Sequence, residues 1–315
     1  MLKKINETRA RNEVRDERHA VILAGGEGSR LRDLTRLIEG DERPKQFCHI
    51  IGGQSLIEAT TQRVSLAIDQ TNIHYSLTAK HGEYFRTILA DVPDRRLHVQ
   101  PMNKGTAPAI LYSLLRISRE SMDAVVGFFP SDHFFTDDAL LMSSVEQAFR
   151  SVESRAAGIV LLGMEADSAE TSYGWIEPSE SLFGGLSSSL SSVMKFWEKP
   201  DPITAGRLLE RGGLWNTFIM IARVSDLLRQ FERYLPELYS LMADSFEALP
   251  AVDEEIIYRY LPETNFSDEI LEKCTSDLHV LRVSDVGWSD LGEPVRVLGT
   301  LSTLGMNTEW MAYAA

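Results

Sequence analysis

The stretch AVILAGGEGSR, residues 20–30, joins a short apolar run to a glycine-rich turn. An apolar run this brief is too short for a globular helix and is typical of a strand buried in a sheet. Glycines let the backbone approach a ligand closely and turn its N–H groups toward phosphate oxygens, and the planar guanidinium of Arg30 suits the same oxygens. The segment therefore predicts a strand that ends in a phosphate-binding loop.

Two common phosphate-binding motifs do not fit this loop. A dinucleotide-binding fingerprint that starts at Gly26 needs a third glycine at the position of Leu31, and a P-loop needs a Gly-Lys-Ser/Thr string, which is absent. A tight strand-to-helix turn with a surface arginine stays open as a purely structural alternative.

Similar short apolar runs recur along the first half of the chain, and amphipathic stretches of helical length lie between them. The runs are residues 73–79, 97–101, 124–130 and 158–164, and the helical stretches are residues 55–68, 106–118 and 137–152. Strands and helices in alternation predict an α/β fold, with a Rossmann-like, mainly parallel mixed sheet covered by helices.

The second half of the chain has a different order of predicted strands and helices. Further strands are expected at residues 173–178, 192–197, 215–222 and 278–283, with helices up to about residue 260. The Gly/Ser-rich residues 183–192 predict a mobile hairpin loop. No repeat or linker divides the chain, so we expect a charged tail or helix at residues 1–18 and a single catalytic domain at residues 19–315.

Composition restricts the class of partner. The 46 Asp and Glu residues outnumber the 32 Lys and Arg residues, for a formal net charge of -14, which repels nucleic acid but still allows a locally positive cleft for a small phosphorylated ligand. No apolar run reaches the roughly 18 residues that cross a bilayer, so we expect no membrane partner and a cytoplasmic location. Cys48 and Cys274 are expected to be reduced, structural thiols. A homodimer is compatible with the sequence, which does not fix the oligomeric state.

Three further motifs carry charged groups suited to phosphoryl chemistry. Lys45, in the string RPKQF at residues 43–47, is a cation that could spread charge off an attacked phosphorus. Asp132 follows a predicted strand, where open α/β sheets bind ligands, and Asp290 stands in a Gly-rich string at residues 286–292. The two carboxylates could share one Mg²⁺, although Asp132 could equally cap a turn. We assign His133 a structural role, because the sequence offers no nucleophile for it to activate.

Two short strings supply groups that read sugar hydroxyls and a sugar phosphate. They are Glu198-Lys199-Pro200 and Trp215-Asn216, which provide carboxylate, ammonium and amide groups. Each string alone also has an ordinary structural explanation, since Glu198 and Lys199 could form a surface ion pair and Trp215 could belong to the core.

Taken together and in this order, the motifs resemble the nucleotidyltransferases that make sugar nucleotides, most closely the mannose-1-phosphate guanylyltransferases. The likeness covers roughly residues 19–292 and implies a GT-A-like nucleotidyltransferase fold. It rests on the glycine loop with Arg30 and on the strings at residues 44–47, 105–109, 130–133, 173–176, 196–200, 215–216 and 287–290.

The resemblance implies a role for each motif. The nucleotide would contact the glycine loop and a helix start, at Leu23, Ala24, Gly25, Gly26, Gly28, Ser29, Gly105, Thr106 and Pro108. Arg30 would hold the outer phosphates, Lys45 the α-phosphate, and Asp132 with Asp290 the Mg²⁺. The sugar phosphate would contact Tyr173, Gly174, Glu198, Lys199 and Asn216.

The implied reaction joins GMP from GTP to mannose 1-phosphate, with release of pyrophosphate and formation of GDP-mannose. Other NTP and hexose 1-phosphate pairs stay open, as does a non-catalytic sugar-nucleotide-sensing subunit on the same fold. A glycosyltransferase is disfavoured, because no Asp-x-Asp pair follows a strand in the first half.

The chain departs from the family pattern at several places. About four extra residues around residues 38–41 delay Pro44, Lys104-Gly105 stands where Arg-Asn is usual, and Thr217-Phe218 replaces Ser-Gly. We therefore expect the glycine loop to close differently. The few residues after Asp290 are expected to leave no room for the C-terminal β-helical segment or the isomerase domain of many relatives.

Overall fold

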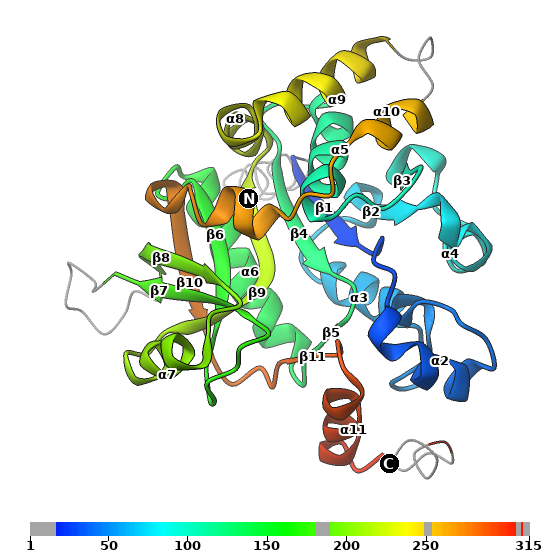
Figure 1. Ribbon diagram of the computed structural model, residues 1–315, viewed down its shortest axis with the longest axis vertical. Coiled ribbons are helices and arrows are strands. Elements are labelled where there is room, and N and C mark those ends of the chain that lie inside the picture. The colour runs from blue at the N-terminus through cyan, green and yellow to red at the C-terminus, as the bar shows by residue number, and fades with distance from the viewer. Residues whose placement is uncertain (1–16, 180–189, 249–253, 307–309, 311–315) are drawn as a thin grey trace, which may run out of the picture.

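The computed structural model describes residues 17–179, 190–248, 254–306 and 310. These residues form a nine-stranded sheet in the order β3-β2-β1-β4-β9-β6-β10-β8-β7, with helices on both faces (Figure 1). The strands are β1 (Arg18–Leu23), β2 (Ile73–Thr78), β3 (Leu97–Gln100), β4 (Val125–Pro130), β6 (Ile159–Glu165), β7 (Gly174–Pro178), β8 (Leu190–Glu198), β9 (Leu214–Arg223) and β10 (Leu278–Val283). Two further strands, β5 (His133–Phe134) and β11 (Ser289–Asp290), pair with each other apart from this sheet.

Helices fill most connections between the strands. They are α2 (Arg32–Glu39), α3 (Leu56–Val64), α4 (Gly82–Ile88), α5 (Thr106–Ser118), α6 (Asp138–Glu153), α7 (Pro202–Glu210), α8 (Val224–Tyr234), α9 (Pro236–Ala248), α10 (Glu254–Tyr260) and α11 (Pro294–Thr303). The helix predicted at residues 106–118 is confirmed at both ends, whereas the one predicted at residues 55–68 ends four residues early, at Val64.

The pairing of the strands confirms a mainly parallel mixed sheet. Strands β3, β2, β1 and β4 pair in parallel, as do β6 and β10. Strand β9 pairs antiparallel with β4 and β6, and β8 with β7 and β10. Among the described strands of this sheet, all except β8 and β9 therefore run in one direction. The carboxyl ends of β1, β2 and β4 consequently meet at one edge, where open α/β sheets bind ligands.

Both faces of the sheet are buried, which explains the continuous apolar runs in its strands. On one face, α3 and α6 pack through residues such as Val64 and Phe149. On the other, α5 and α8 pack through residues such as Leu111 and Leu227. Burying one such side chain contributes about 1.5–3 kcal/mol, so the two layers of helices fix the sheet and the loops at its edge.

The residues around 38–41, which we predicted to be an insertion, form the end of a helix. Helix α2 closes at Gly40, whose φ of 81° is a left-handed cap that glycine adopts without strain. The turn after it is held by Arg43, which donates from its backbone and its guanidinium to Asp41. A small separate cluster that includes Leu34 and Leu301 packs α2 against α11. The residues predicted to be an insertion thus form the end of α2 and the turn after it.

Two sequence predictions fall at the limits of the described residues. Residues 1–16 of the predicted tail lie outside them, and β1 begins at Arg18, one residue earlier than the predicted domain. Arg18 is buried because its guanidinium bonds Glu146 and Glu153 of α6. The predicted mobile loop at residues 183–192 lies mostly outside the described residues, and its last part, from Leu190, belongs to β8. Within the described part of the chain, no helix combines the length and the apolarity needed to span a membrane.

Candidate active site

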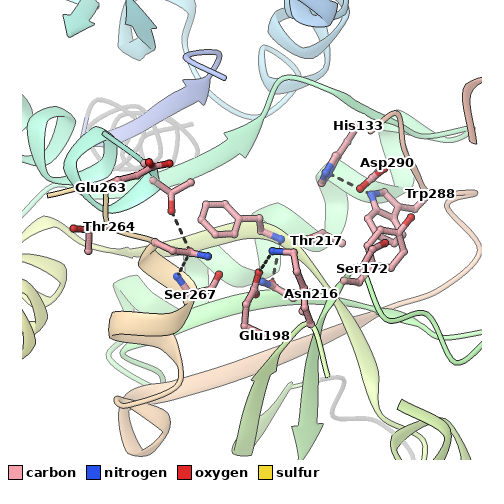
Figure 2. A pocket seen from close by; sticks show the side chains of 17 residues that line it. His133, Ser172, Glu198, Asn216, Thr217, Glu263, Thr264, Ser267, Trp288 and Asp290 are labelled. Carbon is pink, nitrogen blue, oxygen red and sulfur yellow. Dashed lines mark hydrogen bonds and ion pairs between the residues drawn. The ribbon is translucent and has the colours of Figure 1, made fainter. Parts of the chain in front are cut away.

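A cavity of about 380 Å³ opens between strands β7 to β9, the start of α5 and the segment that leads into β11. Figure 2 shows its side chains converging from these elements. The cavity gathers residues from seven stretches of the chain, which is typical of a ligand site and not of a gap between two helices. Its lining residues are Gly105, Thr106, His133, Ser172, Tyr173, Gly174, Glu198, Lys199, Asn216, Thr217, Phe218, Glu263, Thr264, Asn265, Ser267, Trp288 and Asp290.

The predicted sugar-binding residues all line one part of this cavity. Gly174 lies on β7 opposite Glu198 of β8, and Asn216 lies on the neighbouring β9. A Cβ atom at Gly174 would lie 3.1 Å from Glu198 Oε2 and 3.4 Å from the Cβ atom of Asn216. Gly174 therefore leaves space that any side chain would fill, and this space borders a carboxylate and an amide that can bond hydroxyl groups.

Two residues in this wall adopt left-handed backbone conformations that L-residues rarely take. The φ angle is 46° at Lys199 and 58° at Phe218. The left-handed backbone strains Phe218, since a Cβ costs about 1–2 kcal/mol there. Phe218 packs edge-on against Phe266, with 6.2 Å between the ring centres. Strained backbone conformations of this kind are common at ligand-binding sites.

The start of α5 forms another part of the cavity wall. Gly105, with a φ of 90°, lies directly against the backbone of Thr264. Thr106 accepts a hydrogen bond from the backbone of Phe266 at 2.8 Å, and its hydroxyl donates to Asn265 Oδ1 at 3.3 Å. The predicted base-binding residues Gly105 and Thr106 are thus positioned by a loop, residues 263–267, that no sequence motif marks.

Pairing of β5 with β11 brings the two predicted metal ligands to the same place. Asp290 pairs with His133, the residue that follows Asp132, and the backbone N–H of Leu291 donates to Asp132 O at 3.0 Å. His133 lines the cavity and lies 4.0 Å from Asp132 Oδ1, measured from its Nε2 atom. Carboxylates more than 150 residues apart in the chain therefore flank one imidazole.

Each of these carboxylates already has a cationic partner. Lys45 Nζ lies 2.5 Å from Asp132 Oδ2 and also donates to Leu291 O at 3.3 Å. Burial alone would raise the pKa of Asp132, but Lys45 and His133 outweigh it and lower that pKa to about 2. Arg296 donates to Asp290 Oδ1 at 2.6 Å, and the same oxygen accepts the backbone N–H of Gly292 at 2.8 Å.

Arg296 of α11 is a site residue that sequence reasoning missed. Its guanidinium also donates to Ser172 Oγ at 2.5 Å and lies 4.5 Å from the centre of the Tyr173 ring. It thereby joins the Ser172–Tyr173 segment of the cavity to Asp290. Nothing in the string PVRVLG around it marks this role, because an arginine on an amphipathic helix is usually solvated.

His133 is a second residue that the sequence undervalued. We predicted a structural role for it, and its side chain lines the cavity between the two aspartates and accepts a hydrogen bond from Trp288 Nε1 at 3.3 Å when Nδ1 is unprotonated. Burial lowers the pKa of His133, and the carboxylates of Asp132 and Asp290 partly oppose that shift. The feature of the sequence that could have pointed to His133 is its position next to Asp132, directly after a predicted strand.

The glycine loop lies at the carboxyl ends of β1 and β2, next to the Lys45 and Asp132 pair. Its shape is fixed by Gln46, a buried amide that donates to Ala24 O at 2.9 Å and to Gly26 O at 2.8 Å. Thr78 donates to Gly25 O at 3.0 Å. Gly26 has open space where a Cβ would stand. Leu23 ends β1, and Ser131 donates to its carbonyl oxygen at 2.7 Å, which ties Asp132 to this loop.

The remaining predicted nucleotide residues lie farther from the cavity. Gly28, with a φ of 61°, precedes a short 3₁₀ helix, Ser29–Leu31, that contains Arg30. The side chain of Arg30 is 64% exposed and bonds Glu293 at 2.9 Å. Pro108 is buried inside α5. The glycine loop, Arg30 and Pro108 are therefore not among the cavity lining, and their roles toward a nucleotide stay predictions.

Known proteins share this architecture. The profile of the nucleotidyl transferase family matches residues 19–300. The alginate biosynthesis protein AlgA of Pseudomonas syringae pv. tomato is 28% identical over 280 residues, which cover 86% of this chain and 56% of that protein. The mannose-1-phosphate guanylyltransferase of Escherichia coli is 25% identical over 287 residues, covering 86% of this chain and 59% of that protein. The chain thus spans a little more than half the length of these curated relatives.

A solved structure agrees with this likeness at the level of the fold. The crystal structure named mannose-1-phosphate geranyltransferase, from Thermus thermophilus, superposes with a TM-score of 0.73 and 25% sequence identity, covering 88% of this chain and 76% of that one. The family profile covers nearly the whole sheet, both halves of the cavity and the β5–β11 pair. On this evidence the chain belongs to the nucleotidyl transferase family.

Proposed function

We propose that the chain transfers GMP from GTP to mannose 1-phosphate and releases pyrophosphate. The observation that carries the proposal is the cavity itself, where Glu198, Lys199 and Asn216 line one wall and Asp290 stands at its end. Lys199 Nζ lies 2.6 Å from Glu198 Oε1, and it would exchange this partner for the sugar phosphate. The carboxylate of Glu198 and the amide of Asn216 would then bond the hydroxyls. The mannose assignment is supported by the relatives, two of which carry mannose 1-phosphate in their names.

The nucleotide is proposed to lie from the Gly105 wall of the cavity toward the glycine loop. Gly105 and Thr106 would contact the base, since they line the cavity beside the 263–267 loop, apart from the sugar-binding strands β7 to β9. The exposed backbone at Gly26 would face the phosphates, because only there does the loop have open space where a side chain would stand. Lys45, which lies between the loop and the cavity, would meet the α-phosphate.

Direct displacement at phosphorus needs little covalent help from the protein. The sugar phosphate oxygen is already anionic, so no general base is required. It attacks the α-phosphorus, the bond from that phosphorus to the bridging oxygen breaks, and the leaving pyrophosphate takes the electron pair. Lys45 must exchange its contact with Asp132 for the phosphoryl oxygens, and Arg30 must leave Glu293 to hold the pyrophosphate. Positioning and charge neutralisation then supply most of the rate enhancement.

A divalent cation is part of this proposal, and the residues present fit one. Asp132 is held ionised by its low pKa, and β5–β11 pairing brings Asp290 to the same place. The described residues contain no cluster of three or more metal-ligating side chains, but Mg²⁺ usually binds one or two carboxylates and takes its other ligands from water and phosphates. Bound there, Mg²⁺ would neutralise phosphate charge. In this structure, Lys45 and Arg296 balance the negative charges of Asp132 and Asp290.

One experiment tests this function against the alternative of a sugar-nucleotide sensor. Purified protein is incubated with Mg²⁺, each common NTP and each of several hexose 1-phosphates, and pyrophosphate release is followed. We expect GTP with mannose 1-phosphate to give the highest kcat/KM. Binding of GDP-mannose without pyrophosphate release from any pair would identify a sensor and overturn the catalytic proposal.

A further inference from the structure

A second cavity, of about 200 Å³, lies at the opposite edge of the sheet from the glycine loop. It is lined by His74, Arg95, His98, Arg116, Arg119, Glu120 and Phe246. His74 and His98 are the second residues of β2 and β3, so they stand at the amino ends of these parallel strands. The glycine loop follows the carboxyl end of β1. The second cavity is therefore separate from the proposed active site, and nothing in the proposed reaction uses it.

The floor of this cavity contains polar atoms without partners. His98 is completely buried, and neither of its ring nitrogens has a hydrogen-bond partner. His74 is 3% exposed and bonds His19 across 3.0 Å through Nε2, which leaves its Nδ1 without a partner. Leaving a buried polar group unpaired costs about 1–3 kcal/mol, so a ligand that pairs with it is favoured.

The charge around the cavity is mainly positive. Arg95 and Arg119 stand exposed at its edge, Arg116 is half-buried at the end of α5, and Glu120 is the single lining carboxylate. Arg119 donates to the carbonyl oxygen of Phe246, and Arg116 donates to Tyr112 at 3.4 Å, and these contacts leave further N–H groups on each guanidinium for a ligand. Three guanidinium groups against one carboxylate favour an anion, even on a chain with a net charge of -14.

The histidines can serve an anion but not a metal ion. Burial lowers the pKa of His98 well below its ordinary value, and neighbouring His74 and Arg116 lower it further, so the ring is neutral near pH 7. A neutral imidazole keeps one N–H donor in either tautomer. A metal ion is not favoured here, since His19 and His74 bond each other and no metal-ligating cluster of three occurs among the described residues.

We propose that this cavity is a second binding site, specific for a small phosphate-type oxyanion. Arg95, Arg116 and Arg119 would bind its oxygens, and the unpaired N–H of His98 would close the site from below. Its volume is smaller than the roughly 300–1,000 Å³ of sites for drug-sized ligands, which fits orthophosphate or the phosphoryl group of a small phosphomonoester.

The test measures phosphate binding by calorimetry at low ionic strength, without Mg²⁺ or nucleotide. Orthophosphate and glycerol 3-phosphate are titrated separately, because tighter binding of the ester would identify a phosphorylated metabolite as the ligand and tighter binding of the ion would identify free phosphate. The double variant Arg95→Gln/Arg119→Gln removes two exposed cations and should fold normally. We expect its Kd to rise about tenfold or more.

Three further variants make the outcome decisive. Arg207→Gln/Arg211→Gln on and after α7 gives the same change in net charge far from the cavity and should leave Kd unchanged. His98→Asn should weaken binding while the arginines remain. Lys199→Gln separates the two cavities, because it belongs to the proposed sugar site. If Lys199→Gln abolishes binding and the arginine pair does not, or if no phosphate binds at about 10 mM, the second site is refuted and the proposed catalytic function is unaffected.

Discussion

Replacing Gly105 by alanine tests how the cavity is assembled. Gly105 has a φ of 90° and a ψ of -178°, a region that is essentially restricted to glycine. Its missing Cβ would lie 2.4 Å from Thr264 O and 3.0 Å from Thr264 C, both backbone atoms. The substitution therefore strains its own backbone and pushes the 263–267 loop away from the start of α5.

The size of the effect follows from these contacts. The backbone strain costs about 1–3 kcal/mol. The loop is tied to α5 by Thr264 N–H, which donates to Lys104 O at 2.9 Å, and by Ala107 N–H, which donates to Thr264 O at 3.1 Å. Weakening these bonds removes about 0.5–1.5 kcal/mol each. We expect Gly105→Ala to lower the free energy of unfolding by about 2–6 kcal/mol, a large part of the roughly 5–15 kcal/mol of a typical domain.

Urea denaturation followed by circular dichroism measures this change, and steady-state kinetics gives its consequence at the site. Gly206→Ala is the matched control, because Gly206 lies inside α7 with open space around a Cβ, so the substitution should stabilise the protein by about 0.5–1 kcal/mol. Since Gly105 lines the cavity, KM for GTP should also rise in Gly105→Ala. Stability within about 0.5 kcal/mol of wild type would refute the geometric reasoning.

Other predictions concern chemistry, sugar choice and pH. Chelation of divalent metal should abolish pyrophosphate release, and Asp132→Asn or Asp290→Asn should each remove most activity with unchanged circular dichroism; full activity in both variants would contradict a shared metal. Lys45→Met should lower kcat by on the order of 10², whereas a change in KM alone would limit Lys45 to binding. Mannose 1-phosphate should exceed glucose 1-phosphate by about one to two orders of magnitude in kcat/KM, and Asn216→Ala should shrink this ratio without raising KM for GTP; a preference for glucose would reject the mannose assignment. Burial, with a smaller contribution from His19, lowers the pKa of His74 to about 3, so the unfolded chain binds the proton more readily. The neutral His74 ring makes its full contribution to the free energy of unfolding above about pH 6.5, and this contribution falls by about 1.4 kcal/mol per pH unit as the pH drops toward 3. Chemical denaturation at pH 7 and pH 5 should therefore show a smaller loss of stability in His74→Gln than in the wild type, and equal losses would contradict the lowered pKa of His74.

The sequence alone determined the architecture and most of the chemical groups. Short apolar runs separated by amphipathic stretches specify buried parallel strands and covering helices, because a strand buried on both faces must be apolar throughout. The end of α5 could be predicted because its apolar face repeats with helical spacing from Thr106 to Ser118. Asp132 could be selected because a carboxylate directly after a strand falls at the ligand-binding edge of an α/β sheet. Lys45 and Asp290 were selected from the strings that contain them, RPKQF and the Gly-rich residues 286–292.

Only the tertiary structure decided which of these groups meet. Asp290 reaches Asp132 through a two-residue strand pair, β5–β11, too short to leave a periodic pattern in the sequence. Arg296 contacts Asp290 and Ser172 from a helix whose sequence reads as an ordinary surface helix, and the 263–267 loop joins the cavity only because it packs on α5. The charged cavity around His98 likewise combines β2, β3, α5 and α9. Local sequence encodes strands and helices through spacing, whereas contacts between distant segments depend on how the whole chain packs, so they appear only in the folded protein.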